Sequence, residues 1–502
     1  MEHVDVLIVG AGLSGIGAAH HLQTACPWAS FAIFEARDAI GGTWDLFRYP
    51  GIRSDSDMYT LGYSFRPWSG EKAIADGDSI LQYIRDTAAE SGIDQEIRFE
   101  HRIVRADWSS VDARWTVTAE RADTGETVVL TCGFLFSCTG YYRYDHGYQP
   151  DFAGMDRFGG TIVHPQAWPA DLDVSGKRVV VIGSGATAVT LVPALAESAA
   201  HVTMLQRSPS YVASVPATNP AAHLLHRVLP ARWADPAIRW MLALGTQALF
   251  QVSKRWPGVV KRMLRKRLER ELPPGYDIDP HFTPRYDPWD QRLCAVPDGD
   301  LFAAIRSGAA SVVTDHVDTF TETGLRLTSG TELDADIVVS ATGLELLFLG
   351  DIVVSVDGDE VDLPSRLAYK GMMLEGVPNL ALAFGYTNAS WTLKCDLTCD
   401  YVCRLLNHMR DHGLAQCTPR NHDAGVTAKP LLGLSSGYVQ RSADRFPKQG
   451  SQAPWQVHQS YLRDWRVMKR SGIEDEALEL VRRPTSAAVS PVFAAEVGGS
   501  GS

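Results

Sequence analysis

The sequence of 502 residues lacks the features of several protein classes. It has no run of 18 uninterrupted apolar residues, so we expect no membrane-spanning helix. Its eight cysteines are too sparse for a disulfide-stapled fold. Lys plus Arg number 47 against 59 for Asp plus Glu, a net charge of −12, so we expect no nucleic-acid partner. These deficits exclude small secreted scaffolds, integral membrane proteins and sequence-independent nucleic-acid binders.

The remaining composition is that of a globular chain. Hydrophobic residues make up 45% and charged residues 21% of the sequence. A strand pattern starts at Val4, leaving no room for a secretory signal, and repeats of fixed period are absent. We therefore expect a cytoplasmic protein of roughly three domains.

A glycine-rich turn follows the first predicted strand, Val4 to Val9. Gly10-Ala11-Gly12-Leu13-Ser14-Gly15 precedes a helix over Leu13 to Leu22, and a second strand covers Phe31 to Glu35. This spacing is typical of a dinucleotide-binding unit, in which the turn and the helix N-terminus receive the pyrophosphate. Glu35 at the end of the second strand can bind a ribose diol and disfavours a 2′-phosphate, so the site suits FAD. A parallel-sheet turn without a ligand is the alternative.

The same pattern returns downstream with a different charge. Gly183-Ser184-Gly185-Ala186-Thr187-Ala188 lies between a strand over Arg178 to Ile182 and a helix over Thr187 to Glu197. The next strand, Val202 to Gln206, is followed by Arg207 and Ser208. A cation at this place accommodates the 2′-phosphate of NADP, so the second site suits NADPH. An ordinary surface arginine is the alternative for Arg207.

Two such units predict an α/β fold with two Rossmann-like dinucleotide-binding domains, for FAD and NADPH, and a helical insertion. Two small-residue turns, Cys138-Thr139-Gly140 and Ala341-Thr342-Gly343, end strands at Phe134 to Ser137 and Asp336 to Ser340, where they would allow close backbone approach. The predicted boundaries are residues 1–142 and 376–487 for the FAD domain, 150–212 and 289–345 for the NADPH domain, 213–288 for the insertion and 488–502 for a disordered Gly- and Ser-rich tail.

A basic stretch lies inside the helical insertion. Either it is a solvated helix face, which the sequence favours, or it attracts anionic lipid or cofactor phosphates. The second reading would make the protein a peripheral membrane protein. Its cations are Lys254, Arg255, Lys261, Arg262, Arg265, Lys266, Arg267 and Arg270.

Three cysteines, Cys395, Cys399 and Cys403, recur every four residues. On a helix this spacing places them on one face. Iron–sulfur motifs use tighter or unequal spacing on a loop, and no fourth cysteine is near, so we interpret the three as core-packing residues and predict no metal site.

Two longer motifs identify a family. GGTWDLFRYPGIRSD, residues 41–55, resembles the long fingerprint of class B flavoprotein monooxygenases of the Baeyer–Villiger type, and FGGTIVHPQAWP, residues 158–169, matches the short one. The resemblance extends from Val4 to about Asp475. It implies an FAD enzyme that uses NADPH and O₂ to convert ketones to esters or lactones through a C4a-peroxyflavin. It also implies sulfides and thioamides as further substrates.

The resemblance also implies roles for particular residues. Arg292 would be the catalytic arginine, although many family members have Lys-Arg where this chain has Gln291-Arg292. Asp55 would hold and tune Arg292. His164 lies in a stretch that the family uses as an interdomain linker, so we interpret it as a coupling residue rather than a base. Trp44 would pack near the flavin.

The full prediction for the site has two catalytic residues, Arg292 and Asp55. The predicted cofactor-binding residues are Gly10, Gly12, Ser14, Gly15, Glu35, Thr43, Trp44, Asp45, Arg53, Asp55, Val104, Gly183, Ser184, Gly185, Ala186, Thr187, Ala188, Arg207 and Ser208.

Three other functions remain open. An N- or S-oxygenating flavin monooxygenase would share both nucleotide sites but not the fingerprint over residues 158–169. A flavin disulfide reductase would need a redox cysteine pair, which neither Cys26 nor the Cys132/Cys138 spacing provides. A non-catalytic cofactor-binding regulator would bind NADPH without consuming O₂. The preferred substrate, the regiochemistry and the oligomeric state are not predicted.

Overall fold

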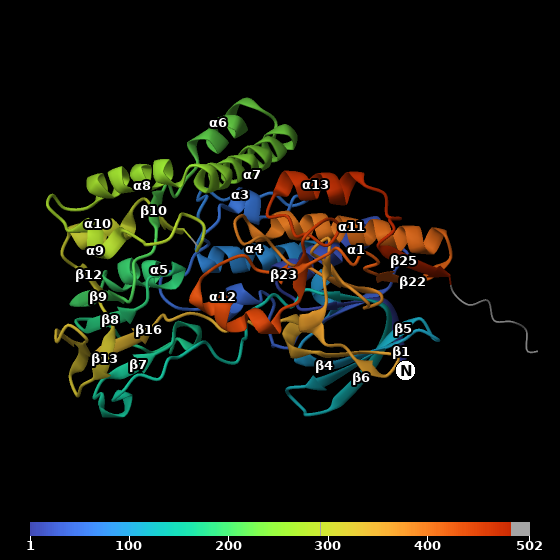
Figure 1. The fold of residues 1–502 in the computed structure, drawn as a ribbon, viewed down its shortest axis with the longest axis horizontal. Coiled ribbons are helices and arrows are strands. Elements are labelled where there is room, and N and C mark those ends of the chain that lie inside the picture. The colour runs from blue at the N-terminus through green and yellow to red at the C-terminus, as the bar shows by residue number, and fades with distance from the viewer. Residues whose placement is uncertain (292, 483–502) are drawn as a thin grey trace, which may run out of the picture.

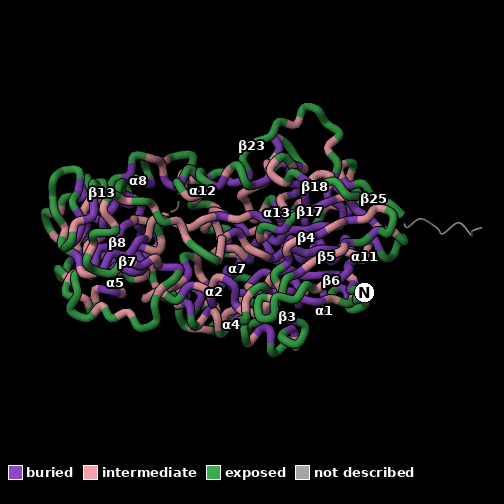
Figure 2. Tube along the Cα trace, turned by 90° about the horizontal axis from the view of Figure 1, so that it is seen from below, coloured by how far each residue is buried: buried purple, intermediate pink, exposed green. Residues whose placement is uncertain are grey.

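A computed structural model describes residues 1–291 and 293–482 of the chain (Figure 1). The predicted tail, 488–502, lies outside these residues. Two sheets form the two halves of the molecule, and Figure 2 shows a buried core in each half.

The first sheet has nine strands in the order β18-β17-β4-β5-β6-β1-β2-β3, with β21 also paired to β6. Strands β3, β2, β1, β6 and β21 run parallel, whereas β4, β5 and β6 form an antiparallel meander. Apolar strand residues are buried on both faces, as expected for a covered sheet. The bounds are β1 Glu2–Val9, β2 Phe31–Phe34, β3 Ile97–Arg98, β4 His101–Ser109, β5 Arg114–Arg121, β6 Thr127–Ser137, β17 Val353–Val356, β18 Asp359–Glu360 and β21 Leu380–Leu382.

The helices of this half come from both ends of the chain. α1 (Leu13–Ala25) packs against α11 (Trp391–Asp411), which in turn contacts α13 (Tyr461–Arg470), and α4 (Gly77–Glu90) packs beside α1. The C-terminal helices therefore pack against the first unit. The stretch 346–375, which had no predicted domain, joins the first sheet through β17.

The second sheet is entirely parallel, in the order β12-β9-β8-β16-β7. Helices α5 (Ala186–Leu195) and α10 (Asp300–Arg306) share a core with one face, and a three-stranded hairpin packs on the other. The bounds are β7 Thr161–Val163, β8 Arg178–Ile182, β9 His201–Gln206, β12 Ala310–Thr314, β16 Ile337–Ser340, and for the hairpin β13 Val317–Phe320, β14 Gly324–Leu327 and β15 Glu332–Asp334.

The predicted helical insertion leaves the second unit through β10 (Val212–Val215) and returns through β11 (Cys294–Pro297), and these two strands pair in parallel. Its helices lie along one edge of the molecule, where α6, α7 and α8 follow one another (Figure 1). They are α6 Pro220–Val228, α7 Ala231–Arg255, α8 Pro257–Glu271 and α9 Ile278–Phe282.

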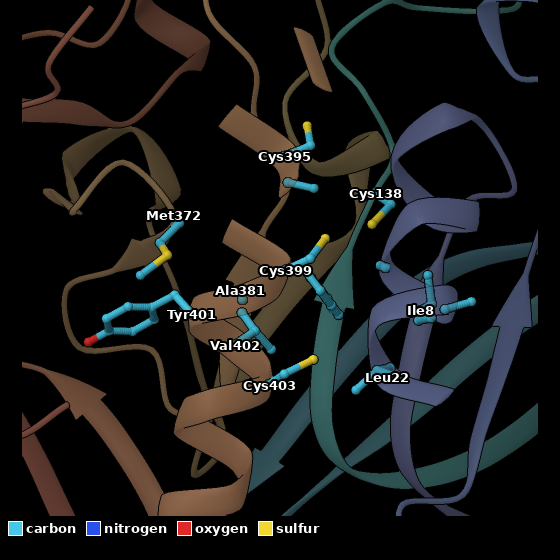
Figure 3. Close-up of a cluster of buried hydrophobic side chains, with 14 of the residues drawn as sticks. Ile8, Leu22, Cys138, Met372, Ala381, Cys395, Cys399, Tyr401, Val402 and Cys403 are labelled. Atoms are coloured by element: carbon cyan, nitrogen blue, oxygen red, sulfur yellow. The ribbon is translucent and has the colours of Figure 1, made fainter. Parts of the chain in front are cut away.

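The three evenly spaced cysteines lie on one buried face of α11, as predicted. Figure 3 shows the sulfur atoms of Cys395 and Cys399 on the side of the helix that faces Cys138. Burial raises the pKa of Cys138 and Cys399, which keeps both as neutral thiols. Among the described residues there is no group of His, Cys, Asp and Glu arranged to hold a metal ion. The cysteines fill the core between α1, β6 and α11.

Candidate active site

One cavity of about 1220 Å³ lies at the carboxyl ends of the parallel strands of both sheets. Both glycine turns and the 41–55 loop line it, so the structure brings the two predicted nucleotide sites into a single space. The predicted residues that line it are Gly10, Gly12, Ser14, Glu35, Thr43, Trp44, Arg53, Asp55, Gly183, Ser184, Gly185, Ala186, Thr187, Arg207 and Ser208.

The first turn is packed so closely that neither Gly10 nor Gly15 has room for a side chain. Gly10 has φ +102°, and a Cβ there would lie 2.8 Å from the carbonyl oxygen of Cys138. A Cβ on Gly15 would lie 1.8 Å from the Gly10 carbonyl oxygen, which explains why α1 approaches β1 so closely. The N-terminus of α1 therefore points its free N–H groups into the cavity, a cradle suited to a pyrophosphate.

Glu35 lies at the rim of this turn, at the end of β2. Its Oε2 accepts a hydrogen bond from the Ala11 N–H at 2.7 Å, and its Oε1 accepts one from the Arg37 N–H at 2.9 Å. Burial raises the pKa of Glu35, while the two N–H donors oppose that rise. Glu35 also lines the cavity, where its carboxylate can accept hydrogen bonds from ribose hydroxyls.

The second turn repeats the geometry of the first. Gly183 has φ +142°, and a Cβ there would lie 2.3 Å from the carbonyl oxygen of Ala341. The Ala341-Thr342-Gly343 turn thus stands to Gly183 as Cys138-Thr139-Gly140 stands to Gly10, which explains the repeated motif. The Ser184 hydroxyl donates to the Ser208 carbonyl oxygen at 3.1 Å and so ties the turn to the segment that carries Arg207.

Four predicted cofactor-binding residues do not line the cavity. Gly15 and Ala188 are buried in the helix–sheet contacts behind the turns. Val104 lies at an irregularity in the pairing of β4 with β5, while His101, Arg102 and Ile103 of the same strand line the cavity. The irregular pairing at Val104 breaks the alternation of β4, which shifts the residues of this strand that face the cavity.

Asp45 is the fourth. Its side chain is 1% exposed, and its carboxylate forms ion pairs with Arg37 at 2.7 Å and with Arg48 and Arg85 at 3.2 Å. Asp45 holds the 41–55 loop against α4, because Arg85 belongs to that helix. Its role in the structure is to anchor the loop that carries Thr43 and Trp44.

The end of the 41–55 loop reaches the second unit. A Cβ on Gly51 would lie 2.7 Å from the Ala194 side chain of α5, so the loop rests on that helix. Arg53 forms an ion pair with Asp300 at the start of α10. Asp55 lines the cavity beside it. Arg292, the predicted partner of Asp55, lies outside the described residues, so its role stays a prediction.

His164 lies under the chain segment that crosses between the units. Its Nδ1 accepts a hydrogen bond from the Gln166 N–H at 3.2 Å, and the Gln166 side chain donates to the Arg143 and Tyr144 carbonyl oxygens at 2.9 and 3.0 Å. A Cβ on Gly147 would lie 2.0 Å from the imidazole. Burial lowers the pKa of His164, so the ring is neutral at pH 7. This packing supports a coupling role.

Sequence reasoning missed several residues of the cavity wall. Tyr144, Tyr148, Tyr386, Trp391 and Arg441 line it from segments far apart in sequence. The Trp391 indole N–H donates to the Ser14 hydroxyl at 2.8 Å, so the start of α11 closes the first turn. Tyr386 and Trp391 lie outside both fingerprints, and nothing in the sequence marks Arg441.

The family follows from sequence comparison. A profile of the flavin-binding monooxygenase-like family matches residues 72–374, and one of an NAD(P)-binding Rossmann-like domain matches residues 8–69. The FAD-containing monooxygenase EthA of Mycobacterium tuberculosis is 55% identical, over 97% of this chain and 100% of the relative. The chain belongs to the flavin-binding monooxygenase-like family.

Other monooxygenases are also similar to this chain. The probable FAD-binding monooxygenase AlmA of Acinetobacter baylyi is 47% identical over 96% of this chain and 97% of the relative. Among solved structures, an oxidized steroid monooxygenase bound to NADP has a TM-score of 0.76 at 22% identity, covering 96% of this chain and 100% of that chain. An open cyclohexanone monooxygenase has a TM-score of 0.68 at 20% identity, covering 84% and 90%.

These findings confirm the predicted family, the two-Rossmann fold and the prediction of a flavin- and nicotinamide-dependent oxidoreductase. The nicotinamide profile covers the first turn, which we assigned to FAD. Both ligands contain an adenosine diphosphate and bind this type of unit alike, so the match identifies the unit rather than the cofactor. Glu35 supports FAD in the first unit and Arg207 supports NADPH in the second.

Proposed function

We propose that this chain is an NADPH- and O₂-dependent FAD monooxygenase that converts ketones to esters or lactones, and that also oxidises sulfides and thioamides. The single observation that carries the proposal is the shared cavity, into which both glycine turns open. The two fingerprints over residues 41–55 and 158–169 favour Baeyer–Villiger chemistry over simple N- or S-oxygenation. Relatives named as FAD-containing monooxygenases give further support.

The residues of the cavity would divide the work of binding. The first turn and Glu35 would hold the adenosine and pyrophosphate of FAD, and the second turn with Arg207 would hold NADPH. FAD, when bound, supplies the redox chemistry and the activation of oxygen. The aromatic wall around Trp44, Tyr386 and Trp391 would exclude water from the reacting atoms. Arg292, with Asp55, would stabilise negative charge that develops on substrate oxygen.

The decisive experiment is an oxygen-uptake assay with NADPH and linear, cyclic and aryl ketones, with product masses measured in parallel. A product that is heavier than its ketone substrate by one oxygen atom supports the proposal. Oxidation of a thioether without any ester from ketones would indicate the N- or S-oxygenating alternative. NADPH binding without substrate-dependent oxygen uptake would indicate a regulator.

We also propose that the helical insertion contacts an anionic lipid surface. No helix among the described residues is long and apolar enough to cross a membrane. Of the sixteen large apolar side chains that are exposed in the described part of the chain, ten lie on or between α6, α7 and α8. They are Leu224, Val228, Leu229, Trp233, Met241, Leu244, Leu249, Trp256, Val259 and Met263.

Their spacing and their neighbours favour lipid over a protein partner. Trp233, Met241 and Leu244 follow one face of α7, and Val259 and Met263 follow one face of α8. On α8, Arg262, Lys266 and Arg270 form an adjacent row, and no ion pair of these three occurs among the described residues. An apolar face beside free cations, in a chain of net charge −12, is the arrangement of interfacial helices on anionic lipid.

Vesicle co-sedimentation tests this surface with the holoenzyme. We expect binding to vesicles of phosphatidylcholine and phosphatidylglycerol and much less to phosphatidylcholine alone. Lys266→Glu should weaken binding about tenfold or more, because each cation contributes about 1 kcal/mol near such a surface and the variant reverses the charge. Trp28→Ser, an exposed aromatic remote from these helices in sequence, is the control. Equal sedimentation of wild type and Lys266→Glu would contradict the proposal, and a dimer broken by Met263→Ser would assign the face to a second copy.

A further inference from the structure

A second arginine faces the coenzyme half of the cavity. Arg441, in α12 (Gly437–Ser442), lines the same cavity as Arg207. The centre of its guanidinium lies 3.5 Å from the centroid of the Tyr148 ring. The Tyr148 N–H donates to the Gly343 carbonyl oxygen at 3.2 Å, and its carbonyl oxygen accepts from the Thr342 hydroxyl at 2.8 Å. The guanidinium therefore rests on a ring that is fixed at the carboxyl end of β16.

This position faces the second glycine turn. A Cβ on Gly343 would lie 3.5 Å from Nη2 of Arg441, so the arginine lies directly over that glycine. Gly343 belongs to the Ala341-Thr342-Gly343 turn, whose first residue packs against Gly183. Arg441 thus reaches the place where the dinucleotide would lie between the glycine turn and Arg207.

The charges around Arg441 also point to an anionic ligand. Burial lowers the pKa of Arg441, and the nearby Arg207 guanidinium lowers it further. Within the described ranges, neither arginine forms an ion pair. Glu345, whose negative charge raises the pKa of Arg441, forms ion pairs with Arg143 and Arg445 instead. Two like charges in one cavity repel, and a phosphate between them would remove that cost.

We propose that Arg441 is a second phosphate-binding cation for the nicotinamide dinucleotide and acts together with Arg207. The proposal rests on the proposed use of NADPH. Val439 of the same helix is buried in the core of the first sheet, so a phosphate held by Arg441 would connect the flavin half of the molecule to the coenzyme half. The phosphate is either the 2′-phosphate or the pyrophosphate of the coenzyme.

The test measures dissociation constants of NADPH, NADH and 2′,5′-ADP for the FAD-loaded enzyme. Arg441→Gln should weaken NADPH binding about tenfold or more, since a charge-assisted hydrogen bond is lost, and Arg441→Lys should lose less. Arg445→Gln is the matched control, because Arg445 is four residues away, is more than half exposed and pairs with Glu345. It should change NADPH binding less than about twofold.

The pattern across ligands identifies the phosphate. Weaker NADPH and 2′,5′-ADP binding with unchanged NADH binding indicates the 2′-phosphate, whereas equal losses for NADPH and NADH indicate the pyrophosphate. If Arg441→Gln binds all three ligands like the wild type, the proposal is wrong. Should that variant fail to bind FAD, Arg441→Met carries the test, because it keeps an unbranched side chain over the Tyr148 ring without the charge, and wild-type NADPH affinity in Arg441→Met would then overturn the proposal. If the wild type consumes NADPH normally while the variant binds all ligands like the wild type, only the role of Arg441 is wrong and the proposed function stands.

Discussion

Arg53 and Asp300 form an ion pair that joins the loop after the first glycine turn to α10 of the second unit. A second contact, between Nη2 of Arg53 and Oδ1 of Asp300, measures 3.4 Å. The Asp300 carboxylate also accepts the Leu301 N–H at 2.7 Å, at the N-terminus of α10. The position of Arg53 at the cavity wall thus depends on both halves of the molecule.

Asp300→Asn should loosen this connection without removing either nucleotide site. The amide keeps an oxygen that can accept the Leu301 N–H but loses the charge that holds Arg53. We expect FAD content to stay near the wild-type value, while the fraction of NADPH oxidation that yields product falls several-fold. Hydrogen peroxide and product are measured together. Asp318→Asn, which breaks an exposed pair with Arg326 on the hairpin, is the control. Unchanged coupling in Asp300→Asn would show that the ion pair has no part in turnover.

Arg207→Ala should change the coenzyme preference. A guanidinium can bind the 2′-phosphate of NADPH through two hydrogen bonds, and NADH lacks that group. The loss amounts to about 1.5–3 kcal/mol, or roughly ten- to a hundredfold in NADPH affinity, with little effect on NADH. The ratio of kcat/KM for the two coenzymes is the measurement, and Arg326→Ala is the control. An unaltered ratio would transfer this role to another cation.

Glu35→Gln should weaken FAD binding. The carboxylate accepts two backbone N–H groups and would also accept the ribose hydroxyls, but an amide offers one acceptor oxygen and turns an NH₂ toward a donor. We expect about a ten- to a hundredfold rise in the FAD dissociation constant, measured by reconstitution of the stripped protein. NADPH binding is the internal control. Full FAD occupancy in a dilute preparation of the variant would contradict the assignment of the first site.

The sequence predicted the two Rossmann units well because their signals are local. Gly10 and Gly183 each occupy a backbone position that excludes side chains, and each is followed directly by its helix. Glu35 and Arg207 end the next strand in each unit, so short-range spacing was sufficient to place them.

The remaining cavity residues come from contacts that sequence spacing does not encode. Arg441 reaches the second unit from a helix that packs on the first, more than two hundred positions after Arg207. Asp45 was predicted at the cofactor because it lies inside the fingerprint, yet three arginines turn it away from the cavity. Val104 does not line the cavity, whereas its neighbours His101, Arg102 and Ile103 do, because the pairing of β4 with β5 is irregular there.

His164→Asn should change how stability depends on pH. Burial lowers the folded-state pKa of His164, so a falling pH protonates this histidine in the unfolded chain before it does so in the folded chain. The contribution of neutral His164 to the free energy of unfolding is fully present above the unfolded pKa of about 6.5 and is lost as the pH falls toward the lower folded value. The wild-type midpoint of thermal unfolding should therefore drop more than that of His164→Asn between neutral and mildly acidic pH.

The same variant tests coupling between the units. FAD should remain bound, because His164 lies away from the first turn, while turnover should fall several-fold. Other histidines with lowered pKa, such as His281 and His458, titrate in both proteins and cancel in the comparison. Identical pH profiles together with full turnover would remove any special role for His164.

Arg292→Ala separates coenzyme oxidation from oxygen transfer. If the cation stabilises negative charge on substrate oxygen, its removal should abolish ester formation while FAD still binds at the remote glycine turn. NADPH oxidation should slow but continue, because hydride transfer does not need that charge, and the oxygen consumed should appear as hydrogen peroxide. Removal of one such stabilising donor costs about a hundred- to a thousandfold in rate, so a few-fold loss of ester would be too small for this role.

Arg292→Lys keeps the charge and should retain part of the activity. Stopped-flow spectra and product assays on one ketone measure both steps, and a normal ester yield from the alanine variant would move the role to Arg53, the arginine beside Asp55 in the cavity wall.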